Sequence, residues 1–311
     1  MRDWTAEDMP DQSGRTFVIT GASSGLGLYS AYALAAKGAT LLLACRSPER
    51  GARAVDQVRT TAPRARVELV RLDLSDLASV RAAAADIRER TDDQLHVLMN
   101  NAGVMGPPLG RTADGFETQM GTNHLGHAAL TWLLMPALRQ TAGARVVTVS
   151  SLAHRRTTLR LDDLNYERRR YNAFGAYSES KLANLMFAQE LDRRLSAASL
   201  DVLSLAAHPG LTDTELGPSG GRARRNKVLE VGITLFNKAF TMRTERGVLP
   251  QLYAATAPGV RGGQYYGPAS MGETRGGPAL AACSPQSQDT SVAAELYALS
   301  GELTGIHPDP S

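Results

Sequence analysis

The chain has 311 residues and a mass of 33.2 kDa, and its 43% hydrophobic and 21% charged residues are typical of a folded globular protein, which excludes disordered and collagen-like classes. The formal net charge at pH 7 is only +3, which does not indicate the strongly basic surface of a nucleic-acid-binding protein. We therefore expect no nucleic-acid partner. Two cysteines, Cys45 and Cys283, are too few for a disulfide framework and fit a reducing compartment.

Residues 1–14 are polar and acidic, and they are predicted to be an extension that precedes the folded domain. They lack the basic and apolar regions of a signal peptide, and no uncharged apolar run in the chain approaches the ~18 residues of a membrane-spanning helix. We therefore expect a cytoplasmic protein without a transmembrane segment.

Apolar runs recur along the first two thirds of the chain, separated by segments of helical periodicity. They cover 15–20, 39–44, 65–72, 94–100, 144–150 and 200–207. Strands that alternate with helices form βαβ units around a parallel sheet, and continuous Val, Leu and Ile runs indicate strands covered on both faces. We therefore predict an α/β fold with a doubly wound parallel sheet in three αβα layers, as a single domain over 15–311. Its elaborated C-terminal part has a further strand candidate at 262–267 and a terminal helix near 291–303.

The first strand ends in a glycine-rich turn, TGASSGLG at 20–27, which a helical segment follows. Glycine permits a positive φ and a close approach of the backbone to a pyrophosphate, while the helix N-terminus offers free N–H groups to the anion. A tight strand-to-helix connection is the alternative, and Ser30 stands where the G-x-G-x-x-G pattern has its third glycine. Its place after the first strand of a βαβ series predicts a Rossmann-type fold that binds a dinucleotide.

The second strand ends at LLLACRSPERG, 41–51, with Arg46 at the place where an acid would bind a ribose 2′-hydroxyl. A guanidinium is a planar, permanently charged group suited to a 2′-phosphate, and Ser23 and Arg50 can assist it. An Arg that merely faces solvent is the alternative. The missing acid favours NADP(H) over NAD(H).

Tyr177 and Lys181 are one helical turn apart, so their side chains share a face, which Asn184 joins. A free Tyr has a pKa near ~10, and a neighbouring ammonium favours the phenolate, which suits acid/base chemistry at neutral pH. An exposed i,i+4 pair on an ordinary helix is the alternative.

The order of these motifs resembles that of the short-chain dehydrogenase/reductase family. The turn has the form T-G-x-x-x-G-x-G, and five further motifs of the family follow it. They are NNAG at 100–103, TNHLGH at 122–127, VSS at 149–151, YSESK at 177–181 and HPGLT at 208–212. The resemblance implies an oxidoreductase that transfers hydride between a nicotinamide and a carbonyl or alcohol.

The resemblance also implies a role for each member of a catalytic group. Tyr177 handles the proton, Ser151 hydrogen-bonds and polarises the substrate oxygen, and Lys181 also holds the nicotinamide ribose. Asn123 maintains a water that relays protons to Lys181. An Asn bonded to backbone at a helix irregularity is the alternative for Asn123, and both can hold.

The contacts with the cofactor follow from the same resemblance. Asp73 corresponds to an acid that contacts adenine, with a helix N-cap as the alternative and Ser75 as a rival cap. No metal site is predicted, because none of the six histidines has carboxylate or cysteine neighbours at metal-binding spacing. The predicted cofactor contacts are Gly21, Ser23, Ser24, Gly25, Leu26, Gly27, Arg46, Asp73, Leu74, Asn101, Ala102, Gly103, Tyr177, Lys181, Pro209, Gly210 and Thr212.

Within the family the chain is similar to the branch of retinol dehydrogenases and protochlorophyllide reductases. The similarity lies in the long segment between Ser151 and Tyr177 and in the sequences SSLAH and SKLANLMF of this chain. Leu211 departs from protochlorophyllide reductases, which have Cys there, and the membrane anchor of animal retinol dehydrogenases is not found. We predict a substrate lid at about 210–241, where the 228–240 segment has the pattern of an amphipathic helix. Core packing and weak contact with a membrane surface are the alternatives for this helix.

We therefore expect an NADP(H)-dependent enzyme that interconverts an apolar aldehyde or ketone, retinal-like or lipid-like, with its alcohol. A non-catalytic nucleotide-sensing or scaffold protein is the alternative, and a sugar-nucleotide epimerase is a third, disfavoured by the spacing of the turn. The resemblance implies a homodimer or homotetramer that pairs through the helices bearing Asn123 and Tyr177.

Overall fold

The computed structural model describes residues 3–211 and 243–310. Two predicted features, the cofactor contact at Thr212 and the lid helix at 228–240, lie outside these residues. Among the helices of the described residues, none is long and apolar enough to cross a bilayer.

One eight-stranded sheet runs through the domain in the order β3-β2-β1-β4-β5-β6-β7-β8. Neighbouring strands from β3 to β7 are parallel, and only β8 runs antiparallel to its neighbour β7. The strands are β1 Thr16–Thr20, β2 Thr40–Cys45, β3 Arg66–Arg71, β4 Val97–Asn100, β5 Ala144–Val149, β6 Val202–Ala207, β7 Tyr265–Ser270 and β8 Arg275–Leu280. All seven predicted strands are confirmed. The edge strand β8 was not predicted, because its sequence RGGPAL has the glycines and proline of a turn.

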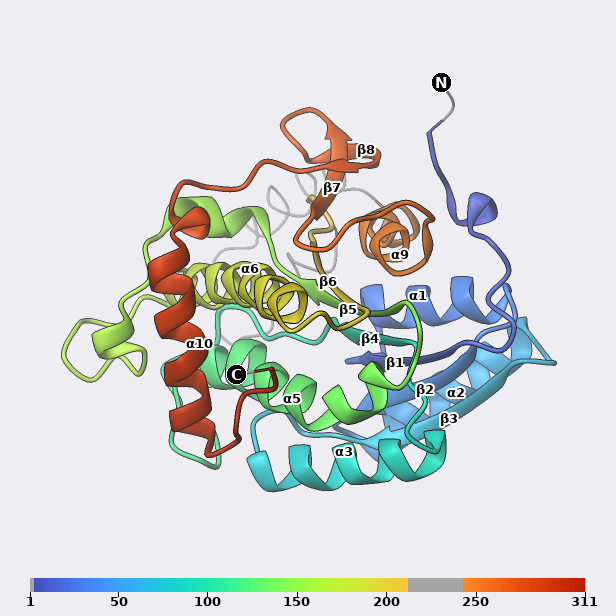
Figure 1. Cartoon of the computed structure of the whole chain (residues 1–311), viewed down its shortest axis with the longest axis horizontal. Helices are drawn as coiled ribbons and strands as arrows, with labels where there is room; N and C mark the ends of the chain where they lie inside the picture. Colours follow the sequence, from blue (N-terminus) through green and yellow to red (C-terminus); the bar gives the residue numbers. More distant parts are fainter. Residues whose placement is uncertain (1–2, 212–242, 311) are drawn as a thin grey trace, which may run out of the picture.

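Helices cover both faces of the sheet, as Figure 1 shows. The longer helices are α1 Gly25–Ala35, α2 Pro48–Thr61, α3 Leu77–Thr91, α5 Gly126–Arg139, α6 Ala173–Ala197, α9 Leu249–Thr256 and α10 Thr290–Thr304. The shorter ones are α4 Thr118–Met120 and α8 Thr244–Gly247, the π-turn η2 Gly121–Leu125, and the 3₁₀ turns η1 Ala6–Asp8, η3 Leu152–Arg156, η4 Leu161–Asp163 and η5 Gln286–Gln288.

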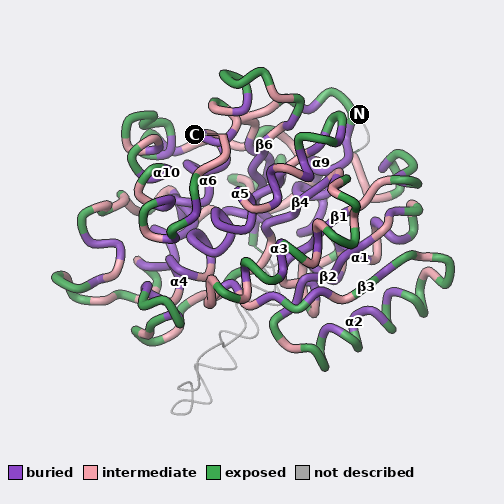
Figure 2. Tube along the Cα trace, turned by 60° about the horizontal axis from the view of Figure 1, so that its bottom comes forward, coloured by how far each residue is buried: buried purple, intermediate pink, exposed green. Residues whose placement is uncertain are grey.

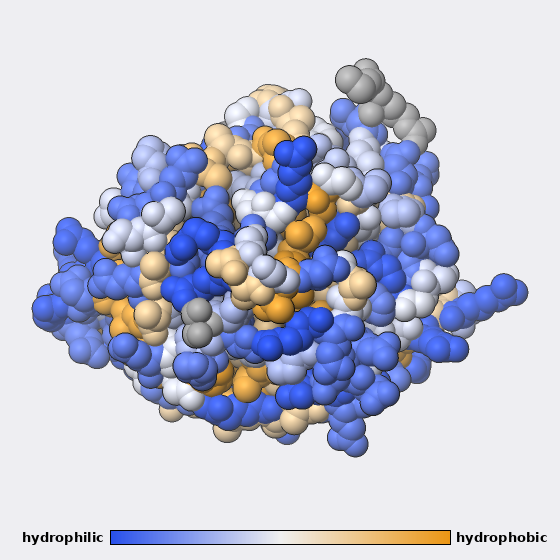
Figure 3. All heavy atoms as spheres, in the orientation of Figure 1, coloured by the Kyte–Doolittle hydropathy of each residue, from blue (hydrophilic) through white to orange (hydrophobic). Residues whose placement is uncertain are grey.

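Alternate residues of β1 pack against opposite helix layers, which confirms the three-layer αβα prediction. Phe17 and Ile19 face one layer and Val18 the other, and all three side chains are fully buried. The first layer contributes Leu34 of α1, Val58 of α2 and Leu252 of α9, and the second contributes Ile87 of α3, Leu134 of α5 and Leu191 of α6. Figure 2 shows the central strands buried between these layers. On the face of the molecule in Figure 3, most residues around the periphery are hydrophilic.

The terminal helix α10, which was predicted, packs over α5 and α6. Tyr297 of α10 accepts a hydrogen bond from Trp132 Nε1 of α5 at 2.9 Å, and its ring stacks on Phe187 of α6 at 5.7 Å between centroids. His124 Nε2 and Ser300 Oγ lie 2.8 Å apart beside them. The helix therefore covers part of the α5 and α6 surface with a buried aromatic cluster.

Four histidines are buried in the fold: His124, His127, His154 and His208 are each no more than 1% exposed. Burial disfavours the imidazolium and lowers the pKa of His124 to about 3 and that of His127 and His154 to about 4. Burial likewise lowers the pKa of His208. All four are therefore neutral in the folded protein at pH 7.

The buried histidines predict a loss of stability in mild acid. In the unfolded chain each histidine takes up a proton near pH ~6.5, whereas in the fold each stays neutral to lower pH. The unfolded state therefore binds more protons below that pH, and the free energy of unfolding should fall by up to ~1.4 kcal/mol per pH unit for each histidine. Urea unfolding followed at pH 7.5, 6 and 5 measures the slope.

Two variants separate buried histidines from exposed ones. His124→Gln should reduce the slope by about one proton, equivalent to ~1.4 kcal/mol per pH unit, whereas His307→Gln, at an exposed position, should leave it unchanged. A free energy of unfolding that is constant between pH 7 and pH 5 would contradict the prediction.

Candidate active site

Tyr177 and Lys181 lie in the first half of α6, whose N-terminus is capped by Asn172. The Asn172 side chain accepts hydrogen bonds from the N–H groups of Phe174 and Gly175 at 3.0 and 3.2 Å. Tyr177 is 5% and Lys181 4% exposed, and the Lys181 Nζ lies 5.8 Å from the centroid of the Tyr177 ring. The alternative of an exposed pair on an ordinary helix is therefore wrong.

The end of β5 holds the lysine in place. Lys181 Nζ donates to the Val149 carbonyl at 3.0 Å, and Asn184 Nδ2, on the same helix face, donates to that oxygen at 3.1 Å. The next residue, Ser150, donates its hydroxyl to the Lys181 carbonyl at 2.7 Å. Three contacts thus join one turn of α6 to the carboxyl end of β5.

The two adjacent serines after β5 have different contacts. Ser150 Oγ is 2.7 Å from the Lys181 carbonyl and serves the packing of α6. Ser151 Oγ accepts the Ala153 N–H at 3.2 Å at the start of η3, so its own O–H remains available for another acceptor. This difference is consistent with Ser151, and not Ser150, as the residue that contacts substrate.

Asn123 occupies the π-turn η2, and its side chain bonds to backbone, as the helix-irregularity alternative requires. Its Oδ1 accepts the Val104 N–H at 2.8 Å, while its Nδ2 donates to the Val104 carbonyl at 3.0 Å and to Ser180 Oγ at 2.9 Å. A Cβ atom placed on Gly103 would lie 3.4 Å from both the Asn123 Oδ1 and the Lys181 Nζ. Asn123 therefore lies close to the lysine, and its water-relay role stays a prediction.

A neutral histidine connects the π-turn to the glycine-rich turn. His127 Nδ1 donates to the Asn123 carbonyl at 2.8 Å, so its Nε2 accepts the Thr20 hydroxyl at 2.9 Å. Thr20 Oγ1 in turn accepts the N–H groups of Asn101 and Ala102, both at 2.9 Å. This chain of hydrogen bonds holds the NNAG segment against the end of β1.

The glycines of the turn permit close packing with that segment. Gly21 has φ +68°, and a Cβ there would lie 2.9 Å from the Ala102 Cα. A Cβ on Gly27 would lie 2.7 Å from the Asn101 Nδ2. Ser30, which replaces the third glycine of the pattern, accepts a hydrogen bond from Gln251 Nε2 of α9 at 2.7 Å. The departure from the pattern is therefore part of the packing of α9 against α1.

A cavity of about 330 Å³ lies along the carboxyl ends of the strands, where open α/β sheets bind their ligands. It brings together most of the predicted cofactor contacts, but its lining does not include Ser151, Asn123, Pro209 or Gly210. Of the predicted residues it contains Gly21, Ser23, Ser24, Gly25, Leu26, Gly27, Arg46, Asp73, Leu74, Asn101, Ala102, Gly103, Tyr177 and Lys181, together with Arg50. The lining residues that sequence reasoning missed are Ala44, Leu72, Val104, Met105, Thr122 and Val149. Most of these residues lie at the carboxyl end of a strand or next to a motif. Including every residue at such a strand end among the predicted contacts could therefore have found them.

Asp73 lines the cavity but does not cap a helix. Its Oδ1 accepts the Ser75 N–H at 3.0 Å and the Ser75 hydroxyl at 2.6 Å, and Asp76 is the N-cap of α3. The alternatives of Asp73 or Ser75 as the cap are therefore wrong. Arg46 is exposed at the end of β2 and lines the same cavity as Arg50 and Ser23.

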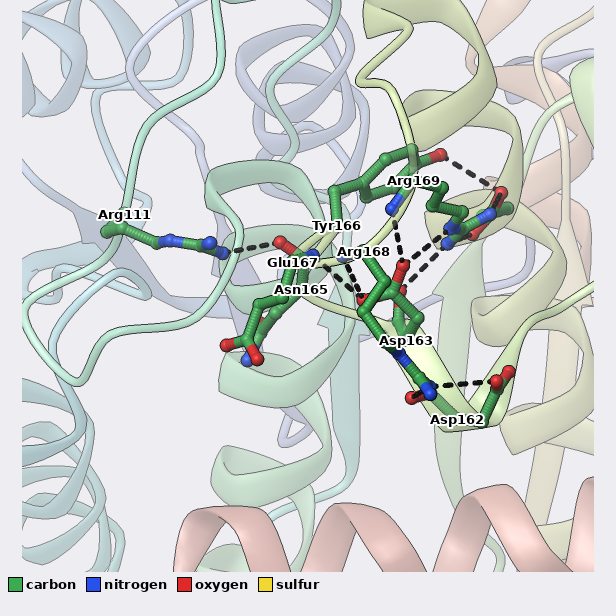
Figure 4. Close-up of polar contacts among 9 residues, drawn as sticks. Arg111, Asp162, Asp163, Asn165, Tyr166, Glu167, Arg168 and Arg169 are labelled. Carbon is green, nitrogen blue, oxygen red and sulfur yellow. Dashed lines mark hydrogen bonds and ion pairs between the residues drawn. The ribbon is translucent and has the colours of Figure 1, made fainter.

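Ion pairs and hydrogen bonds hold the loop before α6, and Figure 4 shows their arrangement. Arg169 donates through its two terminal nitrogens to the two carboxylate oxygens of Glu179, each at 2.7 Å, and Tyr166 donates its hydroxyl to Glu179 at 3.0 Å. Arg168, by contrast, is exposed and pairs with Asp162. Of these two neighbouring arginines, only Arg169 therefore fastens the loop to α6.

The residues that line the cavity have the chemistry that a dinucleotide requires. In the strand order β2-β1-β4-β5, the guanidinium groups of Arg46 and Arg50 follow β2, the glycine-rich turn and the N-terminus of α1 follow β1, and Lys181 bonds to the end of β5. Within 3–211 and 243–310 there is no cluster of three or more His, Cys, Asp or Glu side chains suited to a metal ion.

Comparisons with known proteins agree with this geometry. A model of the short chain dehydrogenase family matches residues 15–224. Retinol dehydrogenase 12 of Homo sapiens is 38% identical over 295 residues, covering 94% of this chain and 87% of that protein. Polyprenol dehydrogenase of Mus musculus is 39% identical over 264 residues, covering 84% and 77% respectively.

A solved structure of an uncharacterised protein from Mycobacterium paratuberculosis is 41% identical, with a TM-score of 0.81 and 99% of both chains covered. The predicted Rossmann-type fold and the resemblance to retinol dehydrogenases are confirmed. Because the family model spans well over half of the sequence, the chain belongs to the short-chain dehydrogenase family.

Proposed function

We propose that the protein is an NADP(H)-dependent oxidoreductase that interconverts an apolar aldehyde or ketone, retinal-like or lipid-like, with its alcohol. The observation that carries the proposal is the buried Tyr177 and Lys181 pair, which lines the same cavity as the glycine-rich turn. Family membership implies a nicotinamide cofactor, and the relatives named retinol and polyprenol dehydrogenases support an apolar substrate.

The proposed chemistry divides between the cofactor and the protein. When bound, the nicotinamide supplies or accepts the hydride. Tyr177 donates its phenolic proton to the carbonyl oxygen, or takes the alcohol proton in the reverse direction. The Lys181 ammonium beside it stabilises the phenolate, and the available O–H of Ser151 donates to the substrate oxygen.

NADP(H) preference is supported by charge at the adenosine end of the cavity. Arg46 and Arg50 both line it there, and Asp73 is held by Ser75 at the end of the neighbouring strand. No acid follows β2 in the sequence CRSPERG before Glu49, whose carboxylate instead accepts the Ser47 hydroxyl at 2.7 Å. Two cations at this position favour a 2′-phosphate over a free hydroxyl.

We also propose that the protein forms a homodimer or homotetramer that pairs through α5 and α6. Such an assembly must accommodate α10, which covers part of that surface with Tyr297. Weak membrane contact depends on the 228–240 segment, outside the described residues. The cytoplasmic location also stays a prediction.

Tyr177→Phe should leave NADPH binding within about twofold of wild type and lower kcat by about 10²- to 10⁴-fold, because only the transferable proton is lost. Fluorescence titration with NADPH and steady-state oxidation of NADPH measure the two quantities. Tyr253→Phe, which removes a hydroxyl from α9 outside the cavity lining, is the control. Turnover retained by Tyr177→Phe would overturn the proposed proton transfer.

Arg46→Asp should exchange the preference for the two cofactors. A charge-assisted hydrogen bond contributes ~1.5–3 kcal/mol, so the KM for NADPH should rise about 10- to 100-fold while the KM for NADH falls. The matched control is Arg53→Asp, an equal charge change at an exposed position of α2 that does not line the cavity. If the two Michaelis constants do not move in opposite directions, Arg46 does not select the cofactor.

A further inference from the structure

The turn between β7 and β8 has an unusual backbone. Its residues Met271, Gly272 and Glu273 have φ angles of 52°, 65° and 64°, so two side-chain-bearing residues adopt the left-handed region. Such a conformation persists only where the surroundings hold it, and it often marks a functional segment. The contacts of Glu273 identify what holds this turn.

Glu273 joins three segments that are far apart in the sequence. Its Oε2 lies 2.5 Å from Arg155 Nη2 and 3.1 Å from His208 Nε2, and its Oε1 accepts the Ala282 N–H at 2.9 Å. Arg155 also donates to the Ala282 carbonyl at 2.9 Å. Although burial alone would raise the pKa of Glu273, the bonds from His208 and Ala282 and the charge of Arg155 lower it to about 2. The group is therefore a carboxylate at neutral pH.

His208, directly after β6, has one hydrogen-bonding arrangement. The Gly210 N–H donates to its Nδ1 at 3.2 Å, so Nδ1 carries the lone pair and the Nε2–H donates to Glu273. The ring lies against β7 at Gly267, where a Cβ would be 1.9 Å from Nε2. The imidazole therefore fixes both the turn of β7–β8 and the backbone at Gly210.

The backbone at Gly210 is tightly enclosed by the same hairpin. Gly210 has φ +73°, and a Cβ there would lie 2.8 Å from the Pro268 Cγ and from the Thr274 carbonyl oxygen. Pro209 and Gly210 follow β6, at the edge of the sheet where β5 also ends. The β7–β8 hairpin thus fixes the position of the backbone at Gly210, at the end of the sheet where β5 and β6 both end.

Arg155 connects Glu273 to the serine after β5. It belongs to η3, whose first turn is tied to Ser151 by the Ala153 N–H to Ser151 Oγ bond and by His154 Nδ1, 2.7 Å from the Ser151 carbonyl. A shift of Arg155 would therefore be transmitted to Ser151.

We propose that Glu273 is a positioning residue that holds the segment 208–210 and the segment 151–155 in the relative arrangement that hydride transfer requires. This inference rests on the proposed function, because Ser151 is the predicted contact with substrate, and Pro209 and Gly210 are predicted contacts with the cofactor. A small displacement of such groups lowers the rate of a reaction that depends on close alignment.

The test compares Glu273→Gln and Glu273→Ala with Glu295→Gln, the same charge change on an exposed position of α10. The first readout is amide hydrogen exchange of the cofactor-free proteins well below their melting temperatures. Both Glu273 variants should exchange faster than wild type at 151–156 and at 207–211, with Glu273→Ala the faster. The exchange of β1 to β4 should not change, and Glu295→Gln should match wild type throughout.

The second readout is the rate of NADPH oxidation in a single turnover. It should fall about tenfold or more in Glu273→Ala, and by less in Glu273→Gln, while the KM for NADPH changes less than about threefold. Exchange and single-turnover rates within twofold of wild type would overturn the inference. So would a lower melting temperature with an unchanged single-turnover rate, since that result indicates a structural role alone.

Failure of the proposed function gives a different result. Wild-type protein would then oxidise no NADPH with any carbonyl compound, while the exchange readout would still report whether Glu273 couples the two segments. Faster exchange at 207–211 without any change at 151–156 would overturn the coupling itself.

Discussion

Lys181 carries a positive charge into the interior of the protein, and the active site is built around it. An ammonium group that is 4% exposed must be bonded, because transfer of an unpaired charge from water into the interior is very costly. The Val149 carbonyl accepts a hydrogen bond from it, and this contact places the first half of α6 across the end of β5. Tyr177, one turn earlier, then reaches the cavity together with the lysine.

The sheet and the main motifs could be predicted because their causes are local in the sequence. Continuous aliphatic runs indicate strands buried on both faces, and parallel strands bring their carboxyl ends to one edge. The glycine-rich turn, the NNAG segment and the Tyr177 and Lys181 pair each adjoin such an end or lie one helical turn apart. Their convergence on one cavity follows from the topology.

Contacts between distant segments could not be predicted in this way. Arg155 and Glu273 are 118 positions apart in the sequence, and Gln251 and Ser30 are 221 apart. Nothing in the sequence near Glu273 distinguishes it from a solvated acid in a glycine-rich turn. The cap of α3 could not be selected from the sequence either, because Asp73, Ser75 and Asp76 are all good capping residues and only the geometry selects Asp76.

The most direct test of the proposed activity is NADPH oxidation with linear aldehydes and ketones of graded chain length, repeated with NADH. An apolar substrate site predicts that kcat/KM rises with chain length, by up to about fourfold for each methylene that is buried, and that NADPH is preferred at every length. Absence of NADPH oxidation with all of these compounds, or oxidation confined to the shortest and most polar of them, would contradict it.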